Sequence, residues 1–228
     1  MHIPDGFING GTSAGAGVIA AGGVAVSLRR SADVLDDKSA PLAGLVAAFI
    51  FAVQMLNFPV ASGTSGHLLG GALAAILVGP WVAALCISVV LLVQGLVFAD
   101  GGLSALGLNI TNMAIIGVGV GYAVFIVLRR MLPANRSGVL AASAVSAAVS
   151  VVAASAGFVV QYAIGGAGSA SVGTVTAAML GVHTLIGVGE AVITALTVGA
   201  VLSVRPDLVY GARDLAATPL LAPSSGAL

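Results

Sequence analysis

The scarcity of charged side chains is the feature that most constrains the fold of this chain. Of 228 residues, only 8 are Lys or Arg and 8 are Asp or Glu, a charged fraction of 7%. A soluble domain carries about 25%. Hydrophobic residues make up 59% of the sequence, so a soluble surface could not be covered. The net charge of +0 leaves no basic footprint for nucleic acid. The composition excludes an ordinary soluble enzyme, a disordered chain and a nucleic-acid binder, and predicts a polytopic membrane protein in a lipid bilayer.

Polar connections divide the chain into seven apolar runs, each of which we interpret as a membrane-spanning helix. A helix needs about 20 apolar residues to cross a hydrocarbon core of roughly 30 Å. The runs cover residues 11–28, 41–56, 67–79, 81–98, 110–128, 138–164 and 178–204. We therefore expect an all-α bundle of seven transmembrane helices. It would form one domain (1–208), followed by a polar C-terminal tail (209–228).

The basic residues predict the orientation of this bundle. Seven spans put the two ends of the chain on opposite sides of the membrane. With the N-terminus outside, the inner segments hold all of the basic residues, namely Arg29, Arg30, Lys38, Arg129, Arg130, Arg136, Arg205 and Arg213. This distribution obeys the positive-inside rule. It predicts an external N-terminus and a cytoplasmic C-terminus.

Missing motifs limit the chemistry that the chain can perform alone. It has no phosphate-binding loop of the form GxxxxGK[ST], and its one lysine, Lys38, lies in a charged connection. It also has no HExxH zinc motif. ATP hydrolysis is therefore not expected in this chain.

The three histidines are candidate metal ligands, because the expected topology puts His2, His67 and His183 on the external side. A single histidine at a helix end is more commonly an ordinary interfacial residue, but three on one side favour a metal site. The start of the chain can form a chelate from the Met1 amine, the His2 amide nitrogen and the His2 Nδ1. One distant imidazole would complete a planar set of nitrogens, which suits Ni(II) or Cu(II).

Local sequence around His2 permits this chelate to fold back into the bundle. Pro4 favours an extended Ile3, and Gly6 permits a turn. A disordered terminus is the alternative interpretation.

Other polar residues have two interpretations each. Ser62, Thr64 and Ser65 precede His67 and could orient its imidazole through hydrogen bonds, or could be ordinary turn residues. His183 and Glu190 are seven residues apart and so share one face of a helix. They could act on the metal site from outside its ligand set, form an acid/base pair of a membrane enzyme, or clamp helices together.

Four segments together resemble the CbiM/NikM family, the substrate-binding (S) components of energy-coupling-factor (ECF) transporters for cobalt and nickel. They are MHIPDGF (1–7), FAVQMLNFPVASGTSGHLLGG (51–71), VQGLVFADGGLSALGLNITNMAIIG (93–117) and HTLIGVGEAVIT (183–194). The resemblance spans residues 1–208. It implies seven helices, an N-terminal segment tucked into the bundle from outside, and metal bound by Met1, His2 and His67. His183 and Glu190 match its last motif without a ligand role.

The resemblance also implies partners and a cargo. The family works in the prokaryotic cell membrane with a membrane coupling component, cytoplasmic ATPase subunits and often a small accessory membrane protein. The transported Ni(II) or Co(II) is the ligand, and no tightly bound cofactor is expected. The opening HIPDG is more similar to nickel members than to cobalt members, although the two groups overlap. A stand-alone metal carrier or channel, or a membrane enzyme using His183 and Glu190, are the alternative functions.

Overall fold

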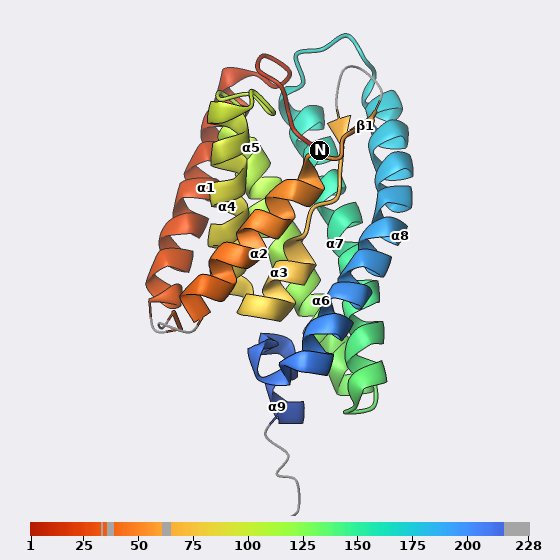
Figure 1. The fold of residues 1–228 in the computed structure, drawn as a ribbon. Coiled ribbons are helices and arrows are strands. Elements are labelled where there is room, and N and C mark those ends of the chain that lie inside the picture. The colour runs from red at the N-terminus through yellow and green to blue at the C-terminus, as the bar shows by residue number, and fades with distance from the viewer. Residues whose placement is uncertain (33, 36–38, 61–64, 217–228) are drawn as a thin grey trace, which may run out of the picture.

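Helices form the body of the protein (Figure 1). The structure is a computed structural model and describes residues 1–32, 34–35, 39–60 and 65–216. The helices are α1 (Gly10–Ser31), α2 (Ser39–Gln54), α3 (Gly71–Val78), α4 (Pro80–Val97), α5 (Leu106–Ile110), α6 (Val118–Met131), α7 (Arg136–Gly165), α8 (Val172–Val204) and α9 (Arg213–Ala216). The remaining elements are the π-helical segment η2 (Thr111–Gly117), the 3-10 turns η3 (Pro206–Leu208) and η4 (Tyr210–Ala212), and the antiparallel strands β1 (Phe58–Pro59) and β2 (Ser65–Gly66).

Polar caps and helix breakers set several helix boundaries. Asn9 caps α1, because its side chain accepts a hydrogen bond from the Thr12 amide at 2.9 Å. Asn135 and Ser171 cap α7 and α8 in the same way. Pro80 opens α4 directly after Gly79, whose φ of 85° ends α3. The helices that the apolar runs predict therefore begin or end at these residues.

The expected all-α membrane protein is confirmed at the level of its apolar helices. Among the described residues, five helical segments are long and apolar enough to cross a membrane: α1, α4, the continuous segment Leu106–Met131, α7 and α8. The helix α2 is apolar but has 16 residues, and α3 has only 8. Every residue of α3 is buried, and it contacts α2, α4, α6, α7 and α8. Small residues allow this packing: Gly71 of α3 lies against the main chain of Gly117 and Val118.

The two ends of the bundle differ in charge. At one end, the Arg30 guanidinium lies 6.0 Å from the centroid of the Trp81 ring, and Arg129 donates a 2.7 Å hydrogen bond to Asp214. At the same end, Arg136 donates a 2.8 Å hydrogen bond to the Ser203 hydroxyl. The N-terminus lies toward the opposite end from α9 (Figure 1). The described arginines thus gather at the end opposite the start of the chain.

The segment 67–70, which we call the strap, corrects the sequence-based expectation of a helix beginning at His67. The strap is not helical, and α3 begins at Gly71. Gly70 has a φ of 75°, which a regular helix does not allow. Side chains from α2 and α8 form hydrogen bonds with the main chain of the strap, in place of the bonds that a helix would make. Gln54 donates to the Leu69 carbonyl at 2.7 Å, and Glu190 accepts from the Leu69 amide at 2.6 Å.

Candidate metal centre

The first residues of the chain are folded into the bundle. Met1 and Ile3 are fully buried, and His2 is 4% exposed. Figure 1 shows the N-terminus inside the bundle, near β1. The sequence left a disordered terminus open as an alternative, and the structure excludes it for these residues.

Hydrogen bonds hold this N-terminal hook (residues 1–8) along its length. The Ile3 amide donates to Asn109 Oδ1 at 2.8 Å, and the Ile3 carbonyl accepts from the Gly102 amide at 2.8 Å. The Asp5 carboxylate accepts from both the amide and the hydroxyl of Ser104, at 2.8 and 2.5 Å. Gly6 makes the turn predicted for it, with a φ of 75°. The hook is therefore an ordered part of the fold, held by specific hydrogen bonds.

The hook brings His2 against His67. The centroids of the two imidazole rings are 4.4 Å apart, and their planes differ by 27°. The two residues come from the start of the chain and from the strap. Two of the three predicted ligand residues are thus in direct contact, and Met1 is the neighbour of His2.

The hydrogen bond of His67 fixes which ring nitrogen is free. Its Nδ1 lies 2.8 Å from the Leu68 carbonyl oxygen, which can only accept, so Nδ1 carries the proton. The lone pair then resides on Nε2. This atom is buried and has no hydrogen-bond partner among the described residues. An unpaired buried acceptor costs about 1–3 kcal/mol, which a bound cation would offset.

His2 presents its Nδ1 in a similar way. Its Nε2 lies 3.1 Å from Gln94 Oε1, an acceptor, so Nε2 donates the hydrogen bond. Burial lowers the pKa of His2, although the nearby Asp100 opposes this. The neutral ring that donates from Nε2 carries its lone pair on Nδ1. This nitrogen lies 2.9 Å from Asp100 Oδ1, close enough for an ion pair when the ring is protonated. His2 Nδ1 and the Asp100 carboxylate can therefore share a cation, either a proton or a metal ion.

The main-chain nitrogens beside these rings are also unpaired. Burial lowers the pKa of the Met1 amine well below its ordinary value, against a smaller opposing effect of Asp100. A neutral amine has a lone pair to donate to a metal. No hydrogen bond of the Met1 amine or the His2 amide is found within the described part of the chain. Among the described residues, the buried region thus holds three nitrogens without hydrogen-bond partners, namely the Met1 amine, the His2 amide and His67 Nε2, and a fourth, His2 Nδ1, whose neighbour is Asp100.

The described residues contain no cluster of metal-binding side chains of the usual kind. Within residues 1–32, 34–35, 39–60 and 65–216, no group of three or more His, Cys, Asp or Glu side chains is arranged to hold a metal. The chelate expected from the start of the chain uses main-chain nitrogens and two imidazoles, so it does not need such a group.

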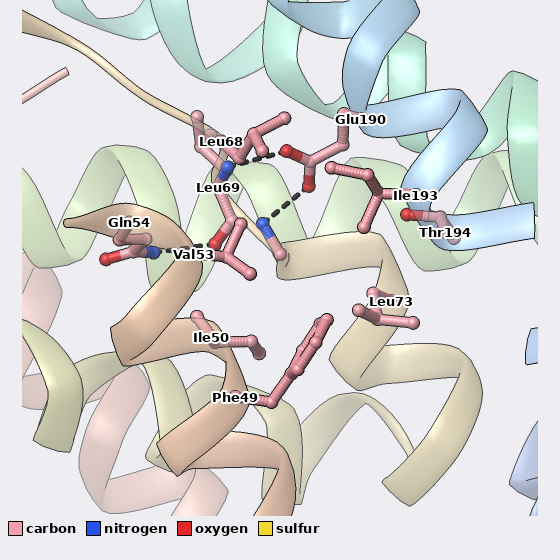
Figure 2. Close-up of a pocket in the computed structure, with 11 residues that line it drawn as sticks. Phe49, Ile50, Val53, Gln54, Leu68, Leu69, Leu73, Glu190, Ile193 and Thr194 are labelled. Carbon is pink, nitrogen blue, oxygen red and sulfur yellow. Dashed lines mark hydrogen bonds between the residues drawn. The ribbon is translucent and has the colours of Figure 1, made fainter. Parts of the chain in front are cut away.

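Among the described contacts, none of the other predicted residues hydrogen-bonds to the ring of His2 or His67. Ser65 lies in β2 and Ser62 and Thr64 lie outside the described residues, so a role for the latter two is untested. His183 is fully buried, and its Nδ1 donates to the Met179 carbonyl at 2.8 Å. Glu190 accepts from the Leu69 and Gly70 amides (Figure 2).

Sequence reasoning missed three residues of this region: Gln94, Asp100 and Asn109. All three lie within the third segment of the resemblance (93–117), but their types alone do not distinguish them from connection residues. Their contacts with residues 2 and 3 span more than 90 positions, |i−j| = 92 for Gln94 and 106 for Asn109. The one usable signal was Asp100, an acid on the external side of the expected topology.

Known proteins are similar to this chain in both sequence and fold. Residues 2–208 match the family CbiM, described as "Cobalt uptake substrate-specific transmembrane region". A protein of Haloquadratum walsbyi named for metal transport is 37% identical over 210 residues, covering 92% of this chain and 94% of that protein. A protein of Archaeoglobus fulgidus named for nickel transport, as the fused chain NikMN, is 41% identical over 213 residues, covering 92% of this chain and 68% of that protein. A crystal structure described as a transition metal transporter superposes with a TM-score of 0.83 at 30% identity, covering 90% of this chain and 93% of that chain.

Proposed function

Because the chain belongs to the CbiM family and is a substrate-specific membrane component for cobalt or nickel uptake, we propose that it captures the ion with nitrogens of Met1, His2 and His67. The Met1 amine, the His2 amide and the His2 Nδ1 form a chelate at the start of the chain. The His67 Nε2 completes the set. One proton leaves the His2 amide as the metal–nitrogen bond forms.

The observation that carries this proposal is the set of unpaired nitrogens. Two imidazoles are in contact, and each has one nitrogen already committed to a hydrogen bond. Among the described residues this leaves His67 Nε2 without a partner and His2 Nδ1 with the Asp100 carboxylate as its one neighbour. The buried amine of Met1 adds a third donor. Buried polar groups are nearly always paired in native proteins, so an unpaired set in one place supports a ligand.

Within the proposal, nickel is favoured over cobalt. Planar nitrogen coordination suits Ni(II) and Cu(II) better than Co(II). The relative from Archaeoglobus fulgidus is named for nickel transport.

The proposal also requires the two rings to move. An ion bound by two imidazoles lies near the plane of each ring, so the stacked rings of His2 and His67 tilt apart as the ion arrives.

The wider assembly is also part of the proposal. We assign residues 1–208 to one seven-helix membrane domain with its N-terminus outside, and residues 209–228 to a cytoplasmic tail. The clustering of described arginines at the end opposite the hook supports this orientation. Uptake is driven by an ECF-type membrane coupling component and cytoplasmic ATPase subunits. The fused NikMN relative supports an accessory N component.

The enzyme alternative does not fit the family or the geometry, and the chain is a transport protein. Both carboxylate oxygens of Glu190 accept hydrogen bonds from main-chain amides. The Nδ1 of His183 donates to Met179. The two side chains are therefore not hydrogen-bonded to each other as an acid/base pair.

An uptake assay separates the proposed function from a stand-alone carrier. Proteoliposomes containing this chain alone, under an inward Ni(II) gradient, are expected to bind the ion without accumulating it. Accumulation should require the coupling and ATPase components and ATP. Sustained accumulation by the chain alone would overturn the proposed dependence on partners.

A further inference from the structure

The peptide group between Leu68 and Leu69 links His67 to a buried carboxylate. The His67 Nδ1 donates to the Leu68 carbonyl oxygen at 2.8 Å. The amide nitrogen of Leu69, which belongs to the same peptide group, donates to Glu190 Oε2 at 2.6 Å. Two hydrogen bonds in series therefore link Glu190 of α8 to the imidazole of His67 through one peptide unit. Figure 2 shows the bond between Glu190 and Leu69.

Glu190 is placed to act through this path as a negative charge. Its second oxygen, Oε1, accepts from the Gly70 amide at 2.5 Å. Both oxygens accept hydrogen bonds, which is the pattern of an ionised carboxylate. Glu190 is 2% exposed and faces the first turn of α3, where the helix dipole favours an anion. A charged residue within a membrane helix is expensive and generally functional.

We propose that Glu190 is a positioning residue for His67, acting through the Leu68–Leu69 peptide group. The inference rests on the proposed function, since it takes His67 Nε2 as a metal ligand. Hydrogen bonds in series polarise one another. The carboxylate thus makes the Leu68 carbonyl a stronger acceptor, which holds the His67 ring in one tautomer and strengthens Nε2 as a donor to the metal. Metal-binding histidines commonly have a carboxylate or carbonyl at the other ring nitrogen; here both act in sequence.

A second contact holds the strap without lying on this path. Gln54 of α2 donates to the Leu69 carbonyl, which belongs to the next peptide group. Thr194 of α8 is buried, 1% exposed, and lines the same small cavity as Glu190 and Gln54. Thr194 therefore offers a control that changes the packing of α8 beside the strap but leaves the path intact.

Nickel affinity and the ligand-field spectrum test the inference together. The full chain, purified in detergent, would be titrated with Ni(II) alone, and the absorption band of the nickel-loaded protein recorded. Glu190→Gln is expected to weaken binding about 10- to 100-fold, as for other residues behind a metal ligand, and to move the band to longer wavelength. Thr194→Val is expected to match the parent protein in both.

A conservative variant separates the charge of Glu190 from its bulk. Glu190→Asp keeps the carboxylate but is one methylene shorter. It is expected to keep the band near the parent position, with a lower melting temperature. A band shift as large as that of Glu190→Gln would overturn the inference, and this variant also serves if Glu190→Gln does not fold.

The two possible failures are distinguishable. If neither the parent protein nor Thr194→Val binds Ni(II), the proposed function itself is overturned. If the parent protein binds Ni(II) through His67, and Glu190→Gln leaves the affinity and the absorption band unchanged, only the inference about Glu190 is overturned.

Discussion

At the scale of single residues, the candidate site depends on which nitrogen atoms are already occupied. His67 commits Nδ1 to the Leu68 carbonyl, and His2 commits Nε2 to Gln94. Each ring is left with one buried nitrogen that is not committed in this way. Burial also keeps the His2 ring and the amine neutral, because it lowers the pKa of both groups. A neutral imidazole and a neutral amine bind a metal without first losing a proton, so the His2 amide is the donor that has to release one.

The lowered pKa of His2 gives a direct prediction. In metal-free protein labelled with ¹⁵N-histidine, the His2 imidazole is expected to stay mainly neutral at pH 6.5, the ordinary pKa of histidine. In the free peptide Met1–Phe7 it should be protonated to a substantial degree at that pH. Asp100→Asn removes the carboxylate that stabilises the protonated ring, so it should lower the His2 pKa further. An equal or higher midpoint in the protein than in the peptide would contradict burial as the dominant effect.

At the scale of elements, the hook and the strap are shaped by contacts between distant parts of the chain. Asn109 of α5 pairs with the main chain of Ile3, accepting at 2.8 Å and donating at 3.4 Å. Gln54 and Glu190 pair with the strap. Non-helical main chain inside a membrane protein requires such partners, because neither lipid nor a helix supplies them.

Loosening the hook should weaken metal binding. Asn109→Leu removes both side-chain bonds to Ile3, so we expect about tenfold weaker Ni(II) binding and faster hydrogen exchange in residues 1–8. Asn135→Ala is the matched control: Asn135 also bonds a main-chain amide, that of Gly138 at 2.9 Å, but at the opposite end of the bundle. It should lower stability without changing the Ni(II) affinity. Equal affinities in the two variants would show that Asn109 does not hold the hook for binding.

Close packing between α1 and α5 predicts an effect on stability. A Cβ at Gly107 would lie 2.5 Å from the Cα of Gly17, whereas a Cβ at Gly119 meets nothing within 4 Å. Gly107→Ala is expected to destabilise the protein by about 1–3 kcal/mol through overpacking. Gly119→Ala should be neutral or slightly stabilising, because alanine favours the helix. Thermal unfolding in detergent measures both, and equal melting temperatures would contradict this packing.

The sequence predicts the parts of the protein that depend on composition and local pattern. Apolar runs and their breakers, such as Pro80, anticipated the helices. Pro4 and Gly6 permitted the hook, which the family resemblance implied. The non-helical strap and the roles of Gln94, Asp100 and Asn109 could not be predicted, since they depend on bonds between residues far apart in the chain. The bond from Glu190 to Leu69, for example, spans |i−j| = 121.

At the scale of the whole molecule, charge and site are separated along the bundle. The hook lies toward one end, and the described arginines lie at the other (Figure 1). In the orientation proposed above from the positive-inside rule, the hook end faces outward, where the ion would arrive. Asp5 and Asp100 are the acids beside the hook. This arrangement favours cations on the side from which they are taken up.

Cysteine labelling in intact cells tests this orientation. In a Cys86→Ser background, Ser169→Cys places an exposed thiol in the α7–α8 connection, at the hook end. Ala134→Cys places one in the α6–α7 connection, at the arginine end. A membrane-impermeant maleimide is expected to label Ser169→Cys in whole cells, and Ala134→Cys only after lysis. The reverse pattern would contradict an external N-terminus.

The central claim is that the start of the chain and His67 together bind the metal. Equilibrium titration of the purified protein with Ni(II) tests it most directly, comparing the parent, His67→Ala and a variant with one alanine inserted between Met1 and His2. The insertion keeps every side chain but breaks the chelate of adjacent nitrogens. We predict one Ni(II) bound per parent chain and a loss of affinity of more than about 100-fold in both variants. Parent-like affinity in the insertion variant would contradict the account.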